Sequence, residues 1–354
     1  MRTGIDSNWA VTGTVRVGTR TKELLQTIDR GAIAAIRHED LDRLAAQGLA
    51  DARVRAVLNG ARTVSGLYPH EGAKPLLERG IPVFDIPEDV FDLLEDGMRV
   101  QVLGETIEVN GNAYACTPVT QETLAAAVRA SSERWHETCL RFIDNTLTHA
   151  AQEKEAVLQP LQVPRLRTRF QGRPAVVVVR GSDYLEDLRS LQPYIERVRP
   201  VLVGVDGGAD ALIAAGWRPH CIVGDMDSVS DRGLRSGAEL IVHAYANGYA
   251  PGWKRVRQLG LHAHQLFAPG TSEDMAMLLA YEQEAEAIVS VGAHSHIADF
   301  LSKGRAGMAS TLLVRMKIGD RLIDAKGVSR LFPAPASLET ARKTGRGREQ
   351  QAYV

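Results

Sequence analysis

Aspartates follow two apolar runs near the middle of the chain, at residues 201–203 and 221–223. The first run leads into Asp206, and the second leads into Asp225 and Asp227. A segment of helical length separates the runs, so the order is strand, acidic turn, helix, strand, acidic turn. Ligands of open parallel sheets bind at the carboxyl ends of the strands. Carboxylates that converge there repel one another unless a cation or hydrogen bonds compensate their charge.

Asp274 adds a fourth carboxylate at the end of another expected strand, 265–267. These acidic turns contain no lysine or arginine, so we predict a hard cation such as Mg²⁺ that bridges to phosphate oxygens. Gly207 and Gly208 would allow the backbone to approach a phosphate closely. The alternative is structural, with Asp206 as a helix N-cap and Asp274 as a first-turn helix charge.

The composition argues against several classes of protein. The 354 residues carry a net charge of −1 and only 5% aromatic residues, which speaks against nucleic acid as a partner. The three cysteines lack C-x-x-C spacing, which speaks against a zinc site and favours a reducing compartment. Residues 1–9 lack a signal-peptide core, and no run of 18 apolar residues occurs. We therefore expect a cytoplasmic protein.

Residues 1–117 are expected to form a small N-terminal α/β domain. The loop 59–72 is rich in Gly, Ser and Pro, and it would either hold an anion at a helix N-terminus or simply connect strand to helix. The expected strands are 11–17, 32–36, 53–58, 83–84, 100–102, 106–109 and 113–116, and the expected helices are 22–27, 40–46, 73–79 and 88–94.

A long connecting helix is expected over 118–158, because no Gly or Pro interrupts this stretch. Thr117 and Pro118 resemble a helix start. At 1.5 Å per residue the helix would be about 60 Å long, which suits a bridge between domains or pairing with a second copy in a homodimer. Its apolar stripe is expected to comprise Leu124, Val128, Trp135, Cys139, Phe142 and Leu147. A linker, 159–172, follows.

The second domain, 173–332, alternates apolar runs with helical segments, which predicts a doubly wound, mainly parallel α/β sheet with a β-rich C-terminal end. The polar tail, 333–354, is expected to be disordered. The expected strands are 175–179, 201–203, 221–223, 239–243, 265–267, 287–291, 311–316 and 322–325, and the expected helices are 183–197, 209–216, 253–259, 275–284 and 298–302.

The acidic turns resemble the catalytic domain of thiamine pyrophosphokinases. The matching motifs are Asp206-Gly-Gly-Ala, Gly224-Asp-Met-Asp-Ser228 and Ser272-Glu-Asp274, and the resemblance covers about 175–300. In that family these aspartates surround Mg²⁺ and ATP, and the enzyme transfers a diphosphoryl group to a primary alcohol. The resemblance thus implies Mg²⁺ and ATP, or another nucleotide, as cofactors.

The wider chain resembles the SteA-type cytokinetic proteins of bacteria, with matching stretches at 180–184, 204–230, 304–311 and 324–327. That resemblance implies a role in cell division with a membrane-associated coiled-coil partner. Many such relatives carry a C-terminal hydrophobic anchor, and 333–354 has none. We therefore expect either a soluble protein or one that a partner recruits to the membrane or division septum.

One motif departs from the pyrophosphokinase pattern G-x-x-x-x-R-x-D-H. In the stretch that begins at Gly292, Ile297 stands in place of the arginine and Phe300 in place of the histidine. Loss of an arginine at a phosphate site removes a contact of roughly 1.5–3 kcal/mol. Lys303 and Arg305 either replace the lost charge or are solvated cations at a helix end.

We therefore expect a divergent pyrophosphokinase-like protein that binds Mg-nucleotide or diphosphate and acts in cell division or envelope regulation. An active thiamine diphosphokinase and a purely structural scaffold are the alternatives. The expected site residues are Asp206, Asp225, Asp227 and Asp274 for the metal, Asp225, Asp227 and Asp274 for catalysis, and Gly207, Gly208, Ser228, Thr271, Ser272, Lys303 and Arg305 for the cofactor.

Overall fold

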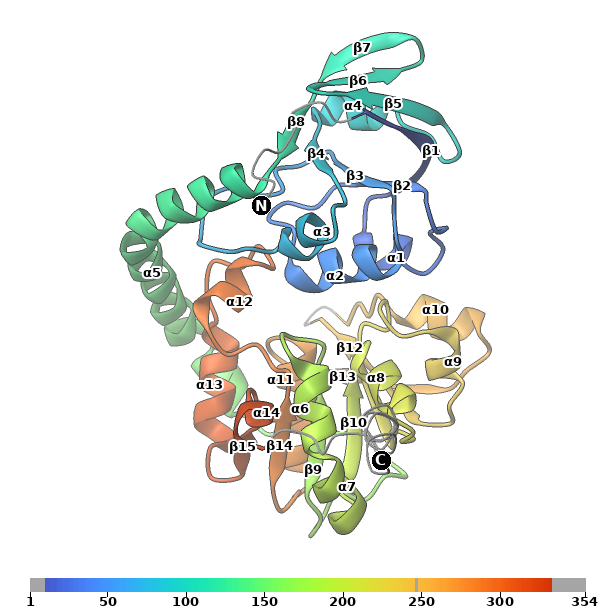
Figure 1. The fold of residues 1–354 in the computed structure, drawn as a ribbon. Coiled ribbons are helices and arrows are strands. Elements are labelled where there is room, and N and C mark those ends of the chain that lie inside the picture. The colour runs from blue at the N-terminus through green and yellow to red at the C-terminus, as the bar shows by residue number, and fades with distance from the viewer. Residues whose placement is uncertain (1–9, 246–247, 333–354) are drawn as a thin grey trace, which may run out of the picture. The chain divides into compact units, whose positions relative to one another are not determined.

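The structure, a computed structural model, describes residues 10–245 and 248–332. Contacts divide this part of the chain into two units (Figure 1). The first unit comprises 10–149 and 295–308, and the second comprises 150–294 and 309–332. The domain boundaries expected from the sequence stay a prediction, as does the disorder of 333–354, which lies outside the described residues.

The described part of the first unit contains one eight-stranded mixed sheet, in the order β7-β6-β5-β1-β2-β3-β4-β8. Strands β1 to β4 run parallel, and β5 pairs with β1 in the antiparallel direction. Asn110 and Gly111 both have positive φ, +53° and +78°, which confirms the expected hairpin turn between β6 and β7. The strands are β1 (Ala10–Gly18), β2 (Ile33–Ile36), β3 (Ala56–Asn59), β4 (Val83–Asp85), β5 (Arg99–Leu103), β6 (Thr106–Val109), β7 (Asn112–Ala115) and β8 (Thr117–Val119).

Both faces of this sheet are covered, since every residue of β2 and β3 is buried. Ala34, Ile36 and Val57 pack against helices α1, α2 and α3 on one face (Figure 1). Ile33 and Leu58 pack against α4 on the other face. The helices are α1 (Thr21–Leu24), α2 (Arg43–Asp51), α3 (Lys74–Glu78) and α4 (Glu88–Asp92).

The long helix is confirmed as α5 (Gln121–Leu158), but its expected start was wrong. Thr117 and Pro118 belong to β8, which pairs with β4. Helix α5 begins after Thr120, whose Oγ1 accepts a hydrogen bond from the Thr123 N–H at 3.1 Å. The expected stripe was also wrong at Leu147, which is 57% exposed. The buried stripe is Leu124, Ser131, Thr138, Phe142, Thr146, Ala150 and Val157.

The second unit contains, among its described residues, one seven-stranded sheet in the order β13-β12-β11-β10-β9-β14-β15. Every pairing in it is parallel, which confirms the doubly wound α/β class. The strands are β9 (Ala175–Val178), β10 (Val201–Val205), β11 (Cys221–Gly224), β12 (Glu239–Ala244), β13 (Ala263–Phe267), β14 (Ile288–Val291) and β15 (Leu322–Asp324).

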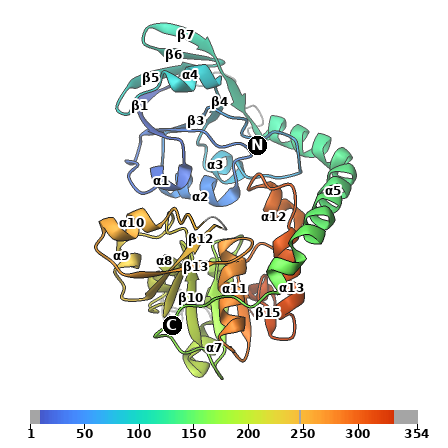
Figure 2. The same ribbon diagram turned by 180° about the vertical axis from the view of Figure 1, so that it is seen from behind.

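Alternate strand residues of this sheet face opposite helix layers. Val177, Val203 and Val223 pack with α11 and α13, on the face turned to the viewer in Figure 2. Val178 and Leu202 pack with α6, α7 and α8 on the other face. Helices α9 and α10 cover β11 and β12 on that second face. These helices are α6 (Tyr184–Ser190), α7 (Gln192–Val198), α8 (Gly208–Ala214), α9 (Asp231–Leu234), α10 (Trp253–Gln258), α11 (Ser272–Glu282), α13 (Ala309–Ile318) and α14 (Val328–Leu331).

Two expectations for this unit were wrong. The segment 311–316, expected as β-structure, lies within helix α13, because Val314 and Ile318 are four residues apart and both enter the core against α11. The segment 183–197 forms two helices, α6 and α7, instead of one. None of the helices in 10–245 and 248–332 combines the length and hydropathy that a membrane span requires.

Candidate functional site

The two acidic turns meet at the carboxyl edge of the second sheet. Val205 of β10 is level with Val223 of β11 in the parallel register, so the turns that follow lie side by side. The Asp206 Oδ1 accepts a hydrogen bond from the Met226 N–H at 3.0 Å. Asp206 has a φ of +45°, which directs its carboxylate across to the second turn. The first acidic turn is thus bonded directly to the second.

Gly224 makes room for this arrangement. Its φ is +148°, and a Cβ at this position would lie 2.0 Å from the Asp206 Oδ1. Any larger residue would have to displace the carboxylate or the backbone. The glycine therefore fixes where the Asp206 carboxylate can lie.

Asp225 and Asp227 close the second turn. The Asp225 Oδ1 accepts a hydrogen bond from the Asp227 N–H at 3.1 Å, which shapes the turn around the buried Met226. Asp225, Asp227 and the next residue, Ser228, are half-buried. Their side chains therefore retain surface at the strand ends where a ligand of a parallel sheet would lie.

Asp210, in the first turn of helix α8, has a structural role. Its Oδ2 accepts from the Ser230 N–H at 2.8 Å, and its Oδ1 accepts from the Ser230 Oγ at 2.5 Å. The Ser230 Oγ in turn accepts from the Gly233 N–H, which caps α9. This chain of bonds holds the segment after Asp227 against α8.

Arg180 brings a cation to the same edge, and the sequence analysis did not assign it to the site. It follows β9, which pairs with β10. A Cβ at Gly207 would lie 2.4 Å from the Arg180 Cδ and 2.8 Å from its Nη1, so the guanidinium lies against the glycine turn. Within the described residues its Nε is buried without a hydrogen-bond partner. An arginine directly after a buried strand, at the edge that carries the aspartates, was the signal available in the sequence.

Asp274 lies at the start of α11 and is fully buried. Its Oδ2 accepts from the Thr271 N–H and Oγ1, both at 2.9 Å, and from the Thr311 Oγ1 at 3.0 Å. Thr271 and Asp274 thereby form a capping box. Burial, and to a lesser degree the charge of Glu273, raises the pKa of Asp274 to about 6.

Two histidines also lie near the start of α11. The His243 Nδ1 is 3.3 Å from the Ser272 Oγ, and the His243 Nε2 is 3.0 Å from the Ala268 carbonyl oxygen. The His294 Nδ1 lies 2.8 Å from the Glu273 Oε1, and both of these side chains are buried. Ser272 and Glu273 are thus engaged with neighbouring segments of the second unit.

The two residues that depart from the pyrophosphokinase pattern, Ile297 and Phe300, lie in helix α12 (Ile297–Leu301), which belongs to the first unit. Phe300 is buried, and its ring centroid lies 6.2 Å from that of Phe142 in α5. Ile297 packs against the same cluster. Lys303 and Arg305 are exposed residues after α12, so they are not part of the arrangement within the second unit. Their expected contact with a nucleotide stays a prediction.

The carboxylates can be tested for their fit to Mg²⁺. Among residues 10–245 and 248–332, no group of three or more His, Cys, Asp and Glu side chains could hold a metal ion by itself. Mg²⁺ commonly takes only one or two carboxylates and completes its octahedron with phosphate oxygens and water. Asp206, Asp225 and Asp227 are half-buried at this edge, and they are the side chains that would share such an ion with a phosphate. The Asp274 Oδ2 is bonded within the cap of α11, whereas its Oδ1 is buried without a hydrogen-bond partner among the described residues, and its expected metal role stays a prediction.

Solved structures that resemble this chain include two weak likenesses. A thiamine pyrophosphokinase from Bacillus subtilis is 23% identical, with a TM-score of 0.28, over 43% of this chain and 60% of its own length. The matched part therefore spans less than two thirds of that protein. A 3-isopropylmalate dehydratase from Methanocaldococcus jannaschii is 12% identical, with a TM-score of 0.24, over 36% of this chain and 96% of its own. At these TM-scores neither likeness supports a conclusion about this chain.

No protein-family model matches the chain, and no curated protein matches it. The fold class therefore rests on the coordinates themselves, which show a fully parallel sheet between two helix layers among the described residues of the second unit.

Proposed function

We propose that the second unit binds a nucleotide, or another molecule with a diphosphate group, together with Mg²⁺ at the carboxyl ends of β9, β10 and β11. One observation carries the proposal: Arg180, which follows the neighbouring strand β9, lies against Gly207 of the first acidic turn. A Mg-diphosphate needs carboxylates for its metal and cations for its phosphate oxygens. This edge supplies both kinds of group from adjacent strands.

Each residue has a defined part in the proposed site. Asp225 and Asp227 would hold Mg²⁺, with Asp206 as a further ligand or as the anchor of the second turn through Met226. Bound Mg²⁺ would neutralise charge on the phosphate oxygens. Arg180 would contact a phosphate oxygen that the metal leaves free. The metal and catalytic roles expected for Asp274 are not part of this proposal, because its carboxyl is buried within the cap of α11.

Calorimetry with Mg²⁺ and ATP, ADP, GTP or GDP tests this proposal. We expect saturable binding that EDTA abolishes and that Asp225→Asn weakens at least tenfold. Asp320→Asn is the matched control, because Asp320 is an exposed aspartate just before β15, at the opposite edge of the sheet. If no nucleotide binds, or if the two variants behave alike, the proposed site is wrong.

An assay of AMP release distinguishes nucleotide binding from catalysis. Release of AMP from ATP in the presence of thiamine would support the alternative of an active diphosphokinase. We expect no release of AMP, because Ile297 and Phe300 stand in place of the arginine and histidine of the pyrophosphokinase pattern. Both residues pack in an apolar cluster with Phe142 instead. A binding protein without diphosphate transfer would use the nucleotide as a signal or structural ligand.

We also propose a role in bacterial cell division, with recruitment to the membrane or septum by a coiled-coil partner. This proposal is supported by the sequence resemblance alone.

Helix α5 offers an exposed apolar surface for pairing with a second copy of the chain. Leu140, Ile143 and Leu147 are spaced three and four residues apart and are 49%, 45% and 57% exposed. We propose that this stripe pairs with a second copy of the chain. Sedimentation velocity should then show a dimer that changing all three residues to serine converts to a monomer.

A further inference from the structure

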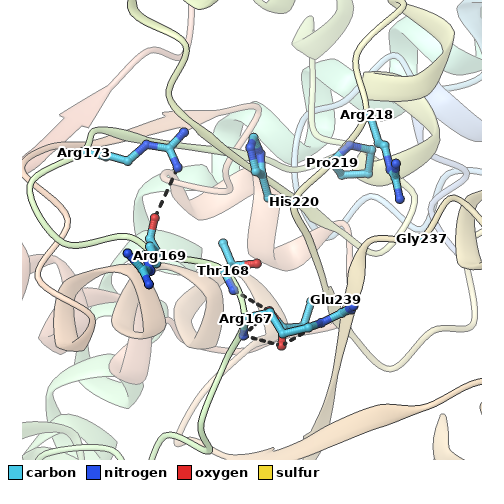
Figure 3. Close-up of a pocket in the computed structure, with 9 residues that line it drawn as sticks. All are labelled: Arg167, Thr168, Arg169, Arg173, Arg218, Pro219, His220, Gly237 and Glu239. Carbon is cyan, nitrogen blue, oxygen red and sulfur yellow. Dashed lines mark hydrogen bonds and ion pairs between the residues drawn. The ribbon is translucent and has the colours of Figure 1, made fainter.

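A strongly basic pocket lies at the opposite edge of the second sheet, where β10, β11 and β12 begin. Its volume is about 530 Å³. Four arginines line it, Arg167, Arg169, Arg173 and Arg218, together with His220. The segment 167–173 forms one side, and residues 218–220 form the other (Figure 3). The five residues of β10 separate this edge from the acidic turns by roughly 15 Å.

The segment expected to be a linker is held in place as the wall of this pocket. Phe170 is buried in the core beneath the sheet. The Arg167 N–H and the Thr168 N–H each donate to the Glu239 carboxylate at 2.9 Å (Figure 3). Glu239 also bonds to the His264 Nε2 at 3.1 Å. The pocket is therefore preformed in the folded chain.

Glu239 offsets only part of the positive charge of the pocket. Burial raises the pKa of Glu239, but the hydrogen bonds from Arg167, Thr168 and His264 outweigh burial and lower it, so this carboxylate is ionised. Its oxygens are occupied by those donors, and the nearest guanidinium atom, the Arg167 Nε, is 3.9 Å from Oε1. One engaged carboxylate thus stands against four guanidinium groups.

The remaining arginines lack carboxylate partners in the described chain. Arg173 donates only to carbonyl oxygens, those of Arg169 at 3.4 Å and Arg199 at 3.0 Å. Within 10–245 and 248–332, neither Arg169 nor Arg218 has an ion pair with an acidic side chain. Guanidinium groups gathered without counter-charge repel one another, and a bound anion removes that repulsion.

His220 adds a neutral donor to this set. Its Nδ1 accepts a hydrogen bond from the Leu202 N–H at 3.0 Å, so the proton of the neutral ring is on Nε2. Burial, and then the charges of Arg173 and Arg218, lower the pKa of His220. The ring is thereby kept as an uncharged hydrogen-bond donor beside the cations.

We infer that this pocket binds a small, multiply charged phosphate anion of the diphosphate class. Guanidinium forks match phosphate oxygens in pairs. The volume falls in the range of small-molecule sites, which is about 300–1,000 Å³. No Phe, Trp or Tyr lines the pocket among the described residues, so it offers no stacking platform for a base. Recognition therefore goes through the phosphates, and nucleic acid is disfavoured.

Calorimetry with inorganic diphosphate in EDTA and low salt tests this inference on the full chain. The proposed site at the acidic turns needs Mg²⁺ to bind a diphosphate, whereas the basic pocket does not. We expect saturable, metal-independent binding that weakens at least tenfold in Arg169→Gln/Arg218→Gln. These side chains make no hydrogen bond in the described structure, so each single variant should fold and weaken binding in part.

The matched control is Arg189→Gln/Arg257→Gln, which removes the same charge from two exposed arginines on α6 and α10. The affinity of this control variant for diphosphate should stay within about twofold of that of the parent chain. ADP in place of diphosphate distinguishes the two sources of the phosphates. Affinity for ADP at least equal to that for diphosphate points to a nucleotide, affinity at least tenfold weaker points to free diphosphate, and either result supports the pocket. Absence of saturable binding in EDTA, or equal binding by both double variants, would overturn it. Asp225→Asn should leave this binding unchanged even if Mg-nucleotide binding fails.

Discussion

The Asp206 carboxylate accepts a hydrogen bond from the Met226 N–H at 3.0 Å, across the ends of two neighbouring parallel strands. Asp206 and Met226 both have positive φ, +45° and +63°. Such conformations are strained for residues with a Cβ, and they persist only where the surroundings fix them. This hydrogen bond joins the two turns into one acidic edge. A substitution in either turn should therefore alter the conformation of the other.

Gly224→Ala tests this connection. The new Cβ would lie 2.0 Å from the Asp206 Oδ1, so we expect loss of the Met226 bond and at least tenfold weaker Mg-nucleotide binding. Unfolding free energy should fall by about 1–3 kcal/mol from backbone strain. Gly260→Ala is the control, because Gly260 also has positive φ, but nothing lies near its Cβ position. Gly260→Ala should lose stability and still bind Mg-nucleotide as the parent chain does. If Gly224→Ala and Gly260→Ala bind Mg-nucleotide equally well, the hydrogen bond between Asp206 and Met226 does not affect ligand binding.

Arg180→Gln tests the phosphate contact. Loss of a charge-assisted hydrogen bond costs about 1.5–3 kcal/mol, so Mg-diphosphate affinity should fall by about ten- to a hundredfold. Folding stability should change little, since the Arg180 Nε makes no hydrogen bond among the described residues. Calorimetry and urea unfolding measure the two effects separately. Affinity equal to that of Arg189→Gln, an exposed arginine on α6, would remove Arg180 from the site.

Asp274 should make stability depend on pH. Its pKa is raised from the usual 3.8 to about 6 in the folded chain, so the unfolded chain releases this proton first as pH rises. Folding stability is therefore lost as pH increases through this window. The difference between these pKa values corresponds to about 3 kcal/mol.

Asp274→Asn removes the titration, and urea unfolding in EDTA at pH 4 and pH 7.5 measures the result. Relative to the parent chain, the variant should gain up to about 3 kcal/mol between the two pH values. A difference between the chains that is the same at both pH values would show that burial does not raise the pKa of Asp274.

The contact between Phe142 and Phe300 should be a major source of stability in the first unit. Each ring is buried, and truncation to alanine should cost about 3–5 kcal/mol. The double variant should cost less than the sum, by about 0.5–3 kcal/mol, because the rings touch one cluster. Leu103→Ala, at an exposed position on β5, should change stability by less than about 0.5 kcal/mol. Strictly additive losses in urea unfolding would exclude direct coupling.

Much of the fold could be predicted because local sequence patterns determine most of its helices, strands and turns. The apolar runs before Asp206 and Asp225 are buried parallel strands, and a run without polar positions is typical of strands covered on both faces. The turn at Asn110 and Gly111 and the interior of α5 also follow from residue type alone. Segment 311–316 was wrongly expected to be a strand, because a short apolar run fits a strand or a buried helix equally well.

By itself, the sequence determined that acidic turns follow two consecutive apolar runs, since the order of runs and carboxylates is fixed along the chain. Only the tertiary structure decided which charged groups meet. It turned Asp274 inward to Thr271 and Thr311, and it placed Arg180 against Gly207. It also joined residues 167 and 168 to Glu239, more than seventy positions away, to form the basic pocket. The physical reason is that the order and register of the strands determine which charged side chains lie close together. Both depend on long-range packing that no local pattern encodes.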